Sequence, residues 1–205
     1  MRPINRDSLP HLVATAVNLA RVVRDTAATR LLARWWDIEL GPGCRFHGRP
    51  LLRRIPGSAI RLGARCELRS ARWSNQVGLD RPCMLSTLRE GAVIEIGEGV
   101  GMSGTIVGAA ERIVIGRNVL VGANCTITDT DWHPVELARR LDGSPALSAP
   151  VVIEDGVWLS MNVTVLKGVT IGAGTVVAAG SVVTRSLPPR VLAGGVPAKV
   201  LKVLG

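Results

Sequence analysis

The stretch IEDGVWLSMNVTVLKGVTIGAGTVVAAGSVVT, residues 153–184, decides the fold. Aliphatic residues recur in it at every sixth position, namely Ile153, Leu159, Val165, Ile171, Val177 and Val183. A second column with the same spacing contains only Gly or Asn, at Gly156, Asn162, Gly168, Gly174 and Gly180. Gly and Asn enter left-handed backbone conformations at low cost. The pattern therefore predicts a short strand and a tight turn in every six residues.

A helix does not explain this pattern, because a helix places apolar residues three and four apart and is weakened by repeated Gly and Asn. A fixed short period is instead typical of a solenoid. Three six-residue strands make one triangular coil, so the inward aliphatic side chains stack in columns. Each buried side chain stabilises the fold by roughly 1.5–3 kcal/mol. We therefore expect an all-β solenoid.

The period continues outside the opening stretch and divides the chain. It begins at Leu40 and is clear again from Ile94, whereas residues 70–92 are irregular. We expect a helical segment at 1–37, the solenoid at 38–187 and a C-terminal turn and apolar tail at 188–205.

Residues 9–36 are predicted to form a basic amphipathic helix. Its apolar residues lie three or four apart, and it ends in Trp35 and Trp36; the apolar positions are Leu12, Ala16, Leu19, Val23, Ala27 and Leu31. Such a helix can lie at a membrane interface. It can equally cap the open end of a solenoid, as repeat folds require. The two roles are compatible.

The net charge of +9 lies entirely in the N-terminal part of the chain. Residues 1–90 carry 16 Arg and 7 acidic residues, whereas residues 91–205 carry 9 basic and 9 acidic residues. Arg is suited to bidentate phosphate and carboxylate contacts. Nucleic acid, an anionic lipid surface or a phosphate-linked glycan could each bind such a basic surface. A basic face that is simply solvated would give the same excess of Arg over acidic residues.

The four cysteines indicate a reducing compartment. Cys44, Cys66 and Cys125 occupy the small inward position of the repeat, and no CxxC pair occurs. Reduced buried thiols are typical of cytosolic proteins. The sequence shows neither a membrane-spanning stretch nor a clear signal peptide. We expect a cytoplasmic protein, with peripheral contact at the inner face of the membrane through its Arg-rich N-terminal region.

His133 is the candidate catalytic residue because it interrupts the repeat. It occupies an aliphatic position three hexads after Ile115, and a polar loop of about residues 134–150 follows it. Long loops within strict repeats are often functional. A neutral imidazole can accept a hydroxyl proton near neutral pH. Asp129, Asp131 or a backbone carbonyl could orient the ring, and the sequence leaves these alternatives open.

A metal site is not expected. The chain has only three histidines, His11, His47 and His133, and their spacing does not fit a zinc site. Neither a Gly-x-Ser-x-Gly nucleophile motif nor a phosphate-binding loop before a helix is present.

Several motifs resemble the hexapeptide-repeat acyltransferases, in particular the galactoside, maltose and nodulation-factor O-acetyltransferases. The resemblance covers about residues 94–202 and rests on IGRNVLVGAN at 115–124, DTDWHP at 129–134, VWL at 157–159, GVTIG at 168–172 and GVPAKV at 195–200. It implies a left-handed parallel β-helix, a homotrimer with active sites between subunits, and acetyl-CoA as co-substrate. It also implies a sugar or glycan acceptor and no nucleic acid.

The resemblance assigns roles to individual residues. His133 matches the general base, and Trp158 matches the family's Trp near the pantetheine arm. The other implied cofactor contacts are Ser160, Ala179, Thr184, Arg185 and Lys199. For the acceptor we expect Ser103, Asp131 and Trp132.

Two residues depart from the family pattern. Ser160 stands where many relatives have Gly and bears on the approach to the thioester. The stretch Gly101–Thr105 lacks the Asn that galactoside enzymes use to bind acceptor, so neither galactoside nor maltose is carried over as substrate. We expect an acetyl-CoA-dependent O-acetyltransferase acting on a sugar hydroxyl, for example of a cell-envelope or exported polysaccharide precursor. The alternatives are N-acetylation of an amino sugar or amine drug, and a non-catalytic β-helical scaffold. Carbonic-anhydrase relatives of the fold are disfavoured by the histidine count.

Overall fold

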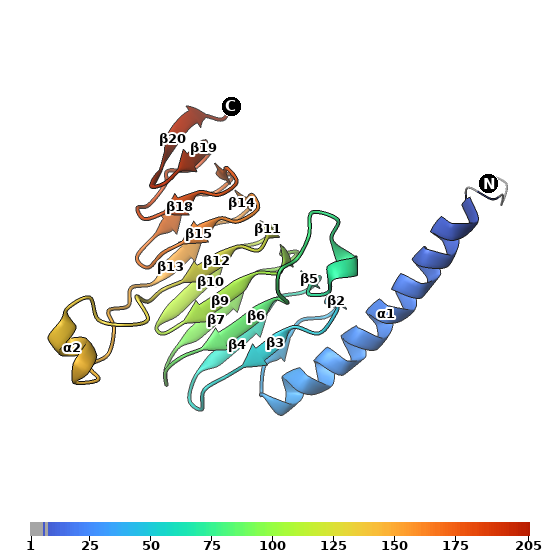
Figure 1. Ribbon diagram of the computed structural model, residues 1–205, viewed down its shortest axis with the longest axis horizontal. Helices are drawn as coiled ribbons and strands as arrows, with labels where there is room; N and C mark the ends of the chain where they lie inside the picture. The colour runs from blue at the N-terminus through green and yellow to red at the C-terminus, as the bar shows by residue number, and fades with distance from the viewer. Residues whose placement is uncertain (1–5, 7) are drawn as a thin grey trace.

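The computed structural model describes Arg6 and residues 8–205, so residues 1–5 and 7 of the predicted N-terminal segment lie outside the described residues. The strands wind into a triangular prism with three sheets as faces, and a long helix lies beside it (Figure 1). Neighbouring strands in each sheet come from successive coils and are parallel, except for the final pair. The chain is thus a parallel β-helix.

Each sheet takes one strand from each coil. Sheet A contains β1 (Glu39–Leu40), β4 (Ala59–Leu62), β7 (Val93–Ile96), β10 (Arg112–Ile115), β13 (Val151–Ile153) and β16 (Thr170–Ile171). Sheet B contains β2 (Arg45–His47), β5 (Glu67–Arg69), β8 (Gly101–Ser103), β11 (Leu120–Ala123), β14 (Trp158–Leu159), β17 (Val176–Val177), β19 (Val191–Gly195) and β20 (Ala198–Val203). Sheet C contains β3 (Leu51–Arg53), β6 (Met84–Thr87), β9 (Ile106–Ala109), β12 (Thr126–Thr128), β15 (Thr164–Val165) and β18 (Val182–Val183).

The predicted aliphatic columns form the core. Ile153 pairs with Ile171 and Leu159 with Val177, so identical hexad positions lie directly above one another. All six aliphatic residues of the opening stretch are fully buried. Cys44, Cys66 and Cys125 are buried as predicted. Burial raises the pKa of Cys125 to about 11, which keeps this thiol protonated and unreactive at neutral pH.

The Gly and Asn column has the predicted backbone conformation. φ is 68° at Gly156, 58° at Asn162, 74° at Gly168, 66° at Gly174 and 69° at Gly180. A residue with a β-branched side chain would be strained in this region. The turns therefore explain why only two residue types occupy these positions.

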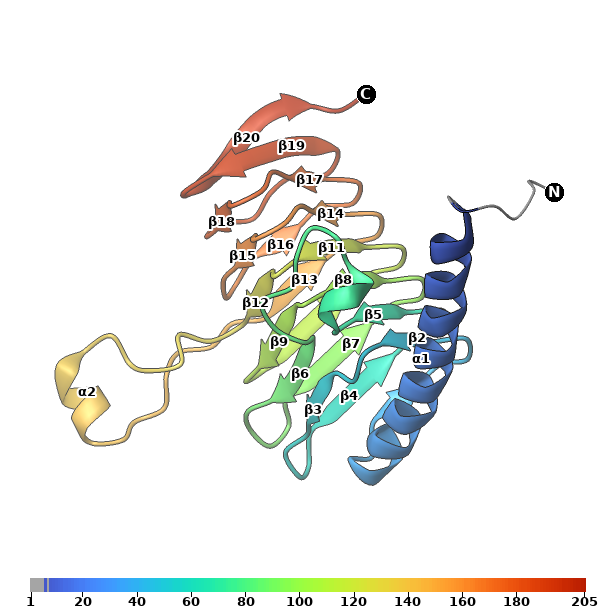
Figure 2. The same cartoon turned by 45° about the vertical axis from the view of Figure 1, so that its right-hand side comes forward.

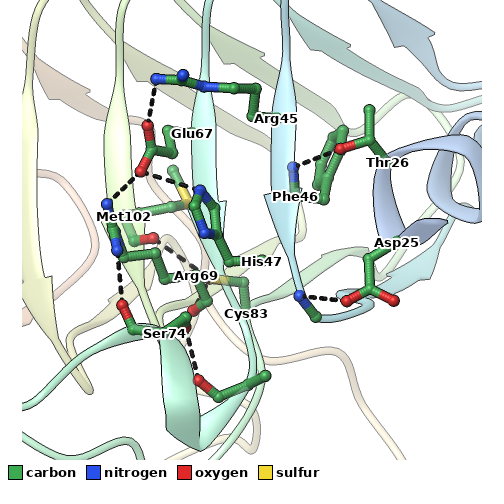
Figure 3. A network of polar contacts seen from close by, with 12 residues as sticks. Asp25, Thr26, Arg45, Phe46, His47, Glu67, Arg69, Ser74, Cys83 and Met102 are labelled. Atoms are coloured by element: carbon green, nitrogen blue, oxygen red, sulfur yellow. Dashed lines mark hydrogen bonds and ion pairs between the residues drawn. The ribbon is translucent and has the colours of Figure 1, made fainter. Parts of the chain in front are cut away.

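Helix α1 (Ser8–Trp35) caps the open end of sheet B. β2 is the edge strand there, and an edge strand leaves backbone N–H groups unpaired. The Phe46 N–H donates to Thr26 Oγ1 at 3.1 Å, and the Gly48 N–H donates to Asp25 Oδ2 at 3.0 Å (Figure 3). Asp25 is only 2% exposed. The helix thus satisfies two backbone N–H groups of the first coil.

The face of α1 that contacts the solenoid is not the predicted aliphatic stripe. The buried helix residues are Asp25, Thr29 and Ala33, whereas Leu12, Leu19, Val23 and Leu31 are exposed. Asp25 and the half-buried Thr26 face the solenoid because they pair with edge N–H groups, which aliphatic side chains cannot do. The buried Thr29 hydroxyl has no hydrogen-bond partner among the described residues. None of the described helices is both long enough and apolar enough to cross a membrane.

Three segments differ from simple hexads. Residues between β5 and β6 include a short 3-10 helix η1 (Arg72–Ser74), and the loop after β12 carries α2 (Leu137–Leu141) well outside the prism (Figure 2). The predicted C-terminal tail is instead a β-hairpin, because β20 pairs with β19 in antiparallel fashion and extends sheet B. The tight connection of this hairpin, between Gly195 and Ala198, lies within the predicted segment 188–205.

We predict that Asp25→Ala destabilises the protein by about 1–3 kcal/mol, because the buried Gly48 N–H loses its acceptor. Asp25→Asn retains a side-chain oxygen that can accept the N–H, so it should lose less stability than Asp25→Ala. The free energy of unfolding, measured by urea denaturation at a fixed protein concentration, tests this order. Equal stability of wild type and the Ala variant would contradict the capping role of α1.

Candidate active site

Asp129 fixes the corner from which the long loop leaves the prism. Its carboxylate is buried and accepts backbone N–H bonds from Ala110, Glu111 and Arg112 at 2.7, 2.8 and 2.7 Å. These bonds tie the end of β12 to the turn after β9. Asp129 is therefore a structural anchor, and it does not bond to His133.

Asp131, the second acid considered for orienting His133, pairs with a lysine. Lys167 Nζ lies 2.6 Å from Asp131 Oδ1. The Asp131 N–H also donates to the Leu147 carbonyl at 3.1 Å. Lys167 is not among the predicted site residues, although its place in the hexad repeat puts it just after β15, the strand beside β12. The ion pair holds the root of the loop against the next coil.

Trp132 lies between this anchor and the candidate base. Its φ of 66° is in the left-handed region, which is uncommon for a bulky residue and often marks a functional site. Its ring lies over Gly108 of β9, 3.3 Å from the position that a Cβ would take. Any larger residue at 108 would displace the ring.

His133 follows Trp132 and is exposed at the root of the loop. It forms no hydrogen bond or ion pair with any residue that the structure describes. None of the three orienting partners considered from the sequence, Asp129, Asp131 or a backbone carbonyl, therefore contacts its ring. The imidazole faces solvent beside the edge shared by sheets C and A.

Two predicted cofactor residues lie along the same edge. Thr184 and Arg185 follow β18, and β18 lies two strands from β12 in sheet C. Since adjacent strands are about 4.8 Å apart, this places them roughly 10 Å along the edge from the root of the loop. Both are exposed. We call the line from His133 through Lys167 to Arg185 the C–A edge.

The other predicted residues gather on sheet B. Trp158 is 49% exposed and is in register with Leu120, which is in register with Gly101. Because Gly101 lacks a side chain, a shallow cavity of about 360 Å³ opens there, lined by both Trp158 and Ser103. The structure thus brings these two predicted residues together.

Ser160 and Ala179 lie where sheet B turns into sheet C, in successive coils, and Lys199 lies on β20. The chain crosses sheet C in one six-residue repeat, roughly 20 Å when extended. The corner between sheets B and C is therefore separated from the C–A edge by the full width of sheet C. A single chain therefore places Trp158 and His133 on different faces of the prism.

A charged network was not anticipated, and two of its residues, Glu67 and Arg69, line the sheet B cavity. Glu67 Oε2 lies 2.8 Å from Arg45, Glu67 Oε1 lies 3.1 Å from His47 Nε2, and Arg69 also pairs with Glu67 (Figure 3). The contact with His47, more than the neighbouring arginines, lowers the pKa of Glu67 to about 2. Parallel pairing places Arg45 beside Glu67 and His47 beside Arg69, so strand register could have revealed this cluster.

Within the part of the chain that the structure describes, no three His, Cys, Asp or Glu side chains are placed to hold a metal ion.

Comparison with known families gives two matches within the solenoid. Residues 150–185 match the model of the bacterial transferase hexapeptide (six repeats), and residues 112–137 match that of the hexapeptide repeat of succinyl-transferase. Both matched stretches belong to the coils that flank the loop of His133.

Two curated relatives come from Escherichia coli K12. WbbJ, named as an O-acetyl transferase of lipopolysaccharide biosynthesis, is 33% identical over 191 residues, covering 89% of this chain and 86% of its own length. Galactoside O-acetyltransferase is 42% identical over 90 residues, covering 44% of this chain and 43% of that enzyme. The chain spans less than half the length of the first curated relatives that it matches.

A solved structure shares the fold over nearly the whole chain. It is a hexapeptide-repeat acetyltransferase of Vibrio cholerae O1 biovar eltor, complexed with acetyl coenzyme A, at 27% identity and a TM-score of 0.55. The match covers 94% of this chain and 85% of that one. The prediction of a left-handed parallel β-helix with an N-terminal helix is confirmed.

We predict that Glu67 contributes to stability in a pH-dependent way. Its folded-state pKa of about 2 lies below the ordinary 4.5, so the unfolded chain binds more protons between these values. The contribution is complete above about pH 4.5 and is lost as the pH falls towards 2. Glu67→Gln should therefore lower the thermal midpoint at pH 7 and flatten its fall below pH 4.5.

Glu111→Gln is the matched control, because the Glu111 side chain is exposed and forms no ion pair with described residues. If both variants followed the wild-type pH profile, the Glu67 network would contribute nothing to folding.

Proposed function

Since this chain belongs to the hexapeptide-repeat acetyltransferases, we propose that it transfers the acetyl group of acetyl-CoA to a sugar hydroxyl, with His133 as the general base. The observation that carries the proposal is the exposed imidazole at the root of the long loop after β12, next to Trp132 with its positive φ. The match to WbbJ over most of both chains supports a glycan acceptor of the cell envelope.

The chain's own residues suit acetyl-CoA. Trp158 presents an exposed ring for the pantetheine arm, and the small side chains of Ser160 and Ala179 leave the adjoining corner open. Arg185 and Lys199 are exposed and form no ion pair with described residues. Unpaired cations of this kind are suited to phosphate. When bound, acetyl-CoA supplies an activated thioester.

The chemistry requires one proton acceptor. His133 takes the proton from the acceptor hydroxyl as its oxygen attacks the thioester carbonyl carbon. The carbon–sulfur bond breaks, and the proton passes from the imidazolium to the departing thiolate. Asp131 stays paired with Lys167 and positions the loop, while Ser103, Asp131 and Trp132 contact the acceptor.

We infer that the active site is completed between copies in a homotrimer. The inference is supported by the separation of Trp158 and His133 on different faces of one prism. In a trimer, the C–A edge of one copy would face the sheet B corner of the next.

The His133→Ala variant should lose acceptor-dependent release of free thiol from acetyl-CoA by at least ~10²-fold, as expected for removal of a general base. His11→Ala is the matched control, because His11 is exposed on α1 and far from the edge in sequence. A panel of sugar acceptors should be assayed with each protein. Undiminished turnover by His133→Ala would exclude the proposed base.

We further propose cytoplasmic location with peripheral contact at an anionic membrane. α1 exposes Leu12, Val13, Leu19 and Val23, and the whole net charge excess of the chain lies in the Arg-rich residues 1–90. Apolar insertion and cationic attraction act together at such a surface.

The protein should therefore co-sediment with phosphatidylserine-containing vesicles. It should dissociate from them as increasing salt screens the charges. Replacing both Leu12 and Leu19 by Glu should weaken the association without altering the solenoid, because both side chains are exposed. Equal sedimentation of wild type with neutral and anionic vesicles, or none at physiological salt, would refute the contact.

A further inference from the structure

An apolar cavity of about 760 Å³ lies on the outer face of sheet C. Its floor is made by outward side chains of the first two strands of that sheet, Leu51 on β3 and Met84 and Ser86 on β6. Leu51 is 53% exposed. The volume falls within the roughly 300–1,000 Å³ typical of small-molecule sites.

The two ends of the cavity belong to features already described. Trp132 closes the end nearest His133, and Leu32 and Trp36, from α1 and the residues just after it, close the other. The strand order is β12, β9, β6 and β3, and the ring of Trp132 lies over Gly108 of β9. The cavity therefore extends from the candidate base to the foot of the helix.

The cavity also reaches the C–A edge. Ile55 and Leu88, which follow β3 and β6 at that corner, form part of its lining. Along the C–A edge, His133 lies between this cavity and Arg185. The strand before His133, β12, is about 15 Å from β3, the farthest strand that lines the cavity. A ligand with its hydroxyl at His133 would therefore extend naturally over the cavity floor.

One cation of the lining is unengaged. Arg53 is exposed and forms no hydrogen bond or ion pair with the residues that the structure describes. The neighbouring Arg54, by contrast, is held by the Trp36 carbonyl at 2.6 Å and by Asp37. The site thus combines an apolar floor with a single available guanidinium, which complements an amphiphile with an anionic head.

We propose that this cavity binds the hydrocarbon chain of a lipid-linked acceptor, with Arg53 contacting its phosphate. This proposal rests on the proposed function, because it names the chemical class of the acceptor for that acetyl transfer. A membrane source fits the surroundings, because Leu31 and Trp35 of α1 are exposed next to the two residues that close the cavity. Exposed apolar side chains of the helix thus stand next in sequence to the residues that line the cavity.

Binding of octyl, decyl and dodecyl phosphate, each below its micelle concentration, tests the proposal by titration calorimetry with the full chain. Each added methylene should tighten binding by roughly fourfold while the chain fits, so decyl phosphate should bind about 16-fold more tightly than octyl phosphate. Leu51→Glu places a carboxylate on the floor and should weaken dodecyl phosphate by at least tenfold. Arg53→Gln should weaken all three ligands by a similar factor.

Val77→Glu is the matched control, because Val77 is 63% exposed, lies outside the cavity and should leave binding unchanged. Absence of chain-length dependence, or equal binding by Leu51→Glu and wild type, would overturn the proposal. A changed molecular mass of the Leu51→Glu assembly by light scattering would also overturn it, since another copy would then cover the cavity. These titrations need no acetyl-CoA, so their failure leaves the thiol-release result unaffected.

Discussion

The turn that closes each six-residue repeat is the constraint on which the rest of the structure depends. A backbone with positive φ at Gly156, Asn162 and their equivalents lets the chain change direction without interrupting the inward aliphatic column. Because every coil turns at the same three corners, residues far apart in sequence come to lie along one straight edge. Lys167 meets Asp131 across 36 positions for this reason.

This geometry allows a loop to carry chemistry without disturbing the core. The segment after β12 leaves at one corner and returns in register, since Ile115 on one side still pairs with Ile153 on the other. Asp129 and the Lys167–Asp131 pair secure its root. His133 is thus attached to a rigid prism although it stands at the start of a long excursion. The same edge carries Arg185 in one direction and the apolar cavity in the other.

Sequence periodicity predicted the features that depend on local backbone and burial. The hexads, the positive-φ column and the buried cysteines each follow from residue type at a fixed spacing. The orientation of α1 does not follow from residue spacing. Asp25 faces the solenoid because it accepts the Gly48 N–H at the edge of the first coil, and the helix sequence alone does not reveal that partner. The C-terminal hairpin was likewise missed, since Pro188 and Gly194 resemble a turn-rich tail.

The sequence proposed His133, Trp158 and Ser103 as site residues, but it did not show how they are grouped. Ser103 and Trp158 share a cavity because Gly101, on the same strand as Ser103, has no side chain beside Leu120 and Trp158, which becomes evident only from strand register. The partner of Asp131 and the apolar cavity beside Trp132 also depend on contacts between coils. Residue types thus suggested candidate residues, and the stacking of coils determines which of them lie close together.

The central claim is acetyl transfer from acetyl-CoA to a hydroxyl oxygen. Its most direct measurement is to incubate the purified protein with radiolabelled acetyl-CoA and isolated envelope glycolipids, and then to treat the labelled product with hydroxylamine. An acetyl ester releases its label under this treatment, which is the result that the account predicts. Label that resists hydroxylamine would show an amide and contradict O-acetylation, and absence of any labelled acceptor would contradict the transfer itself.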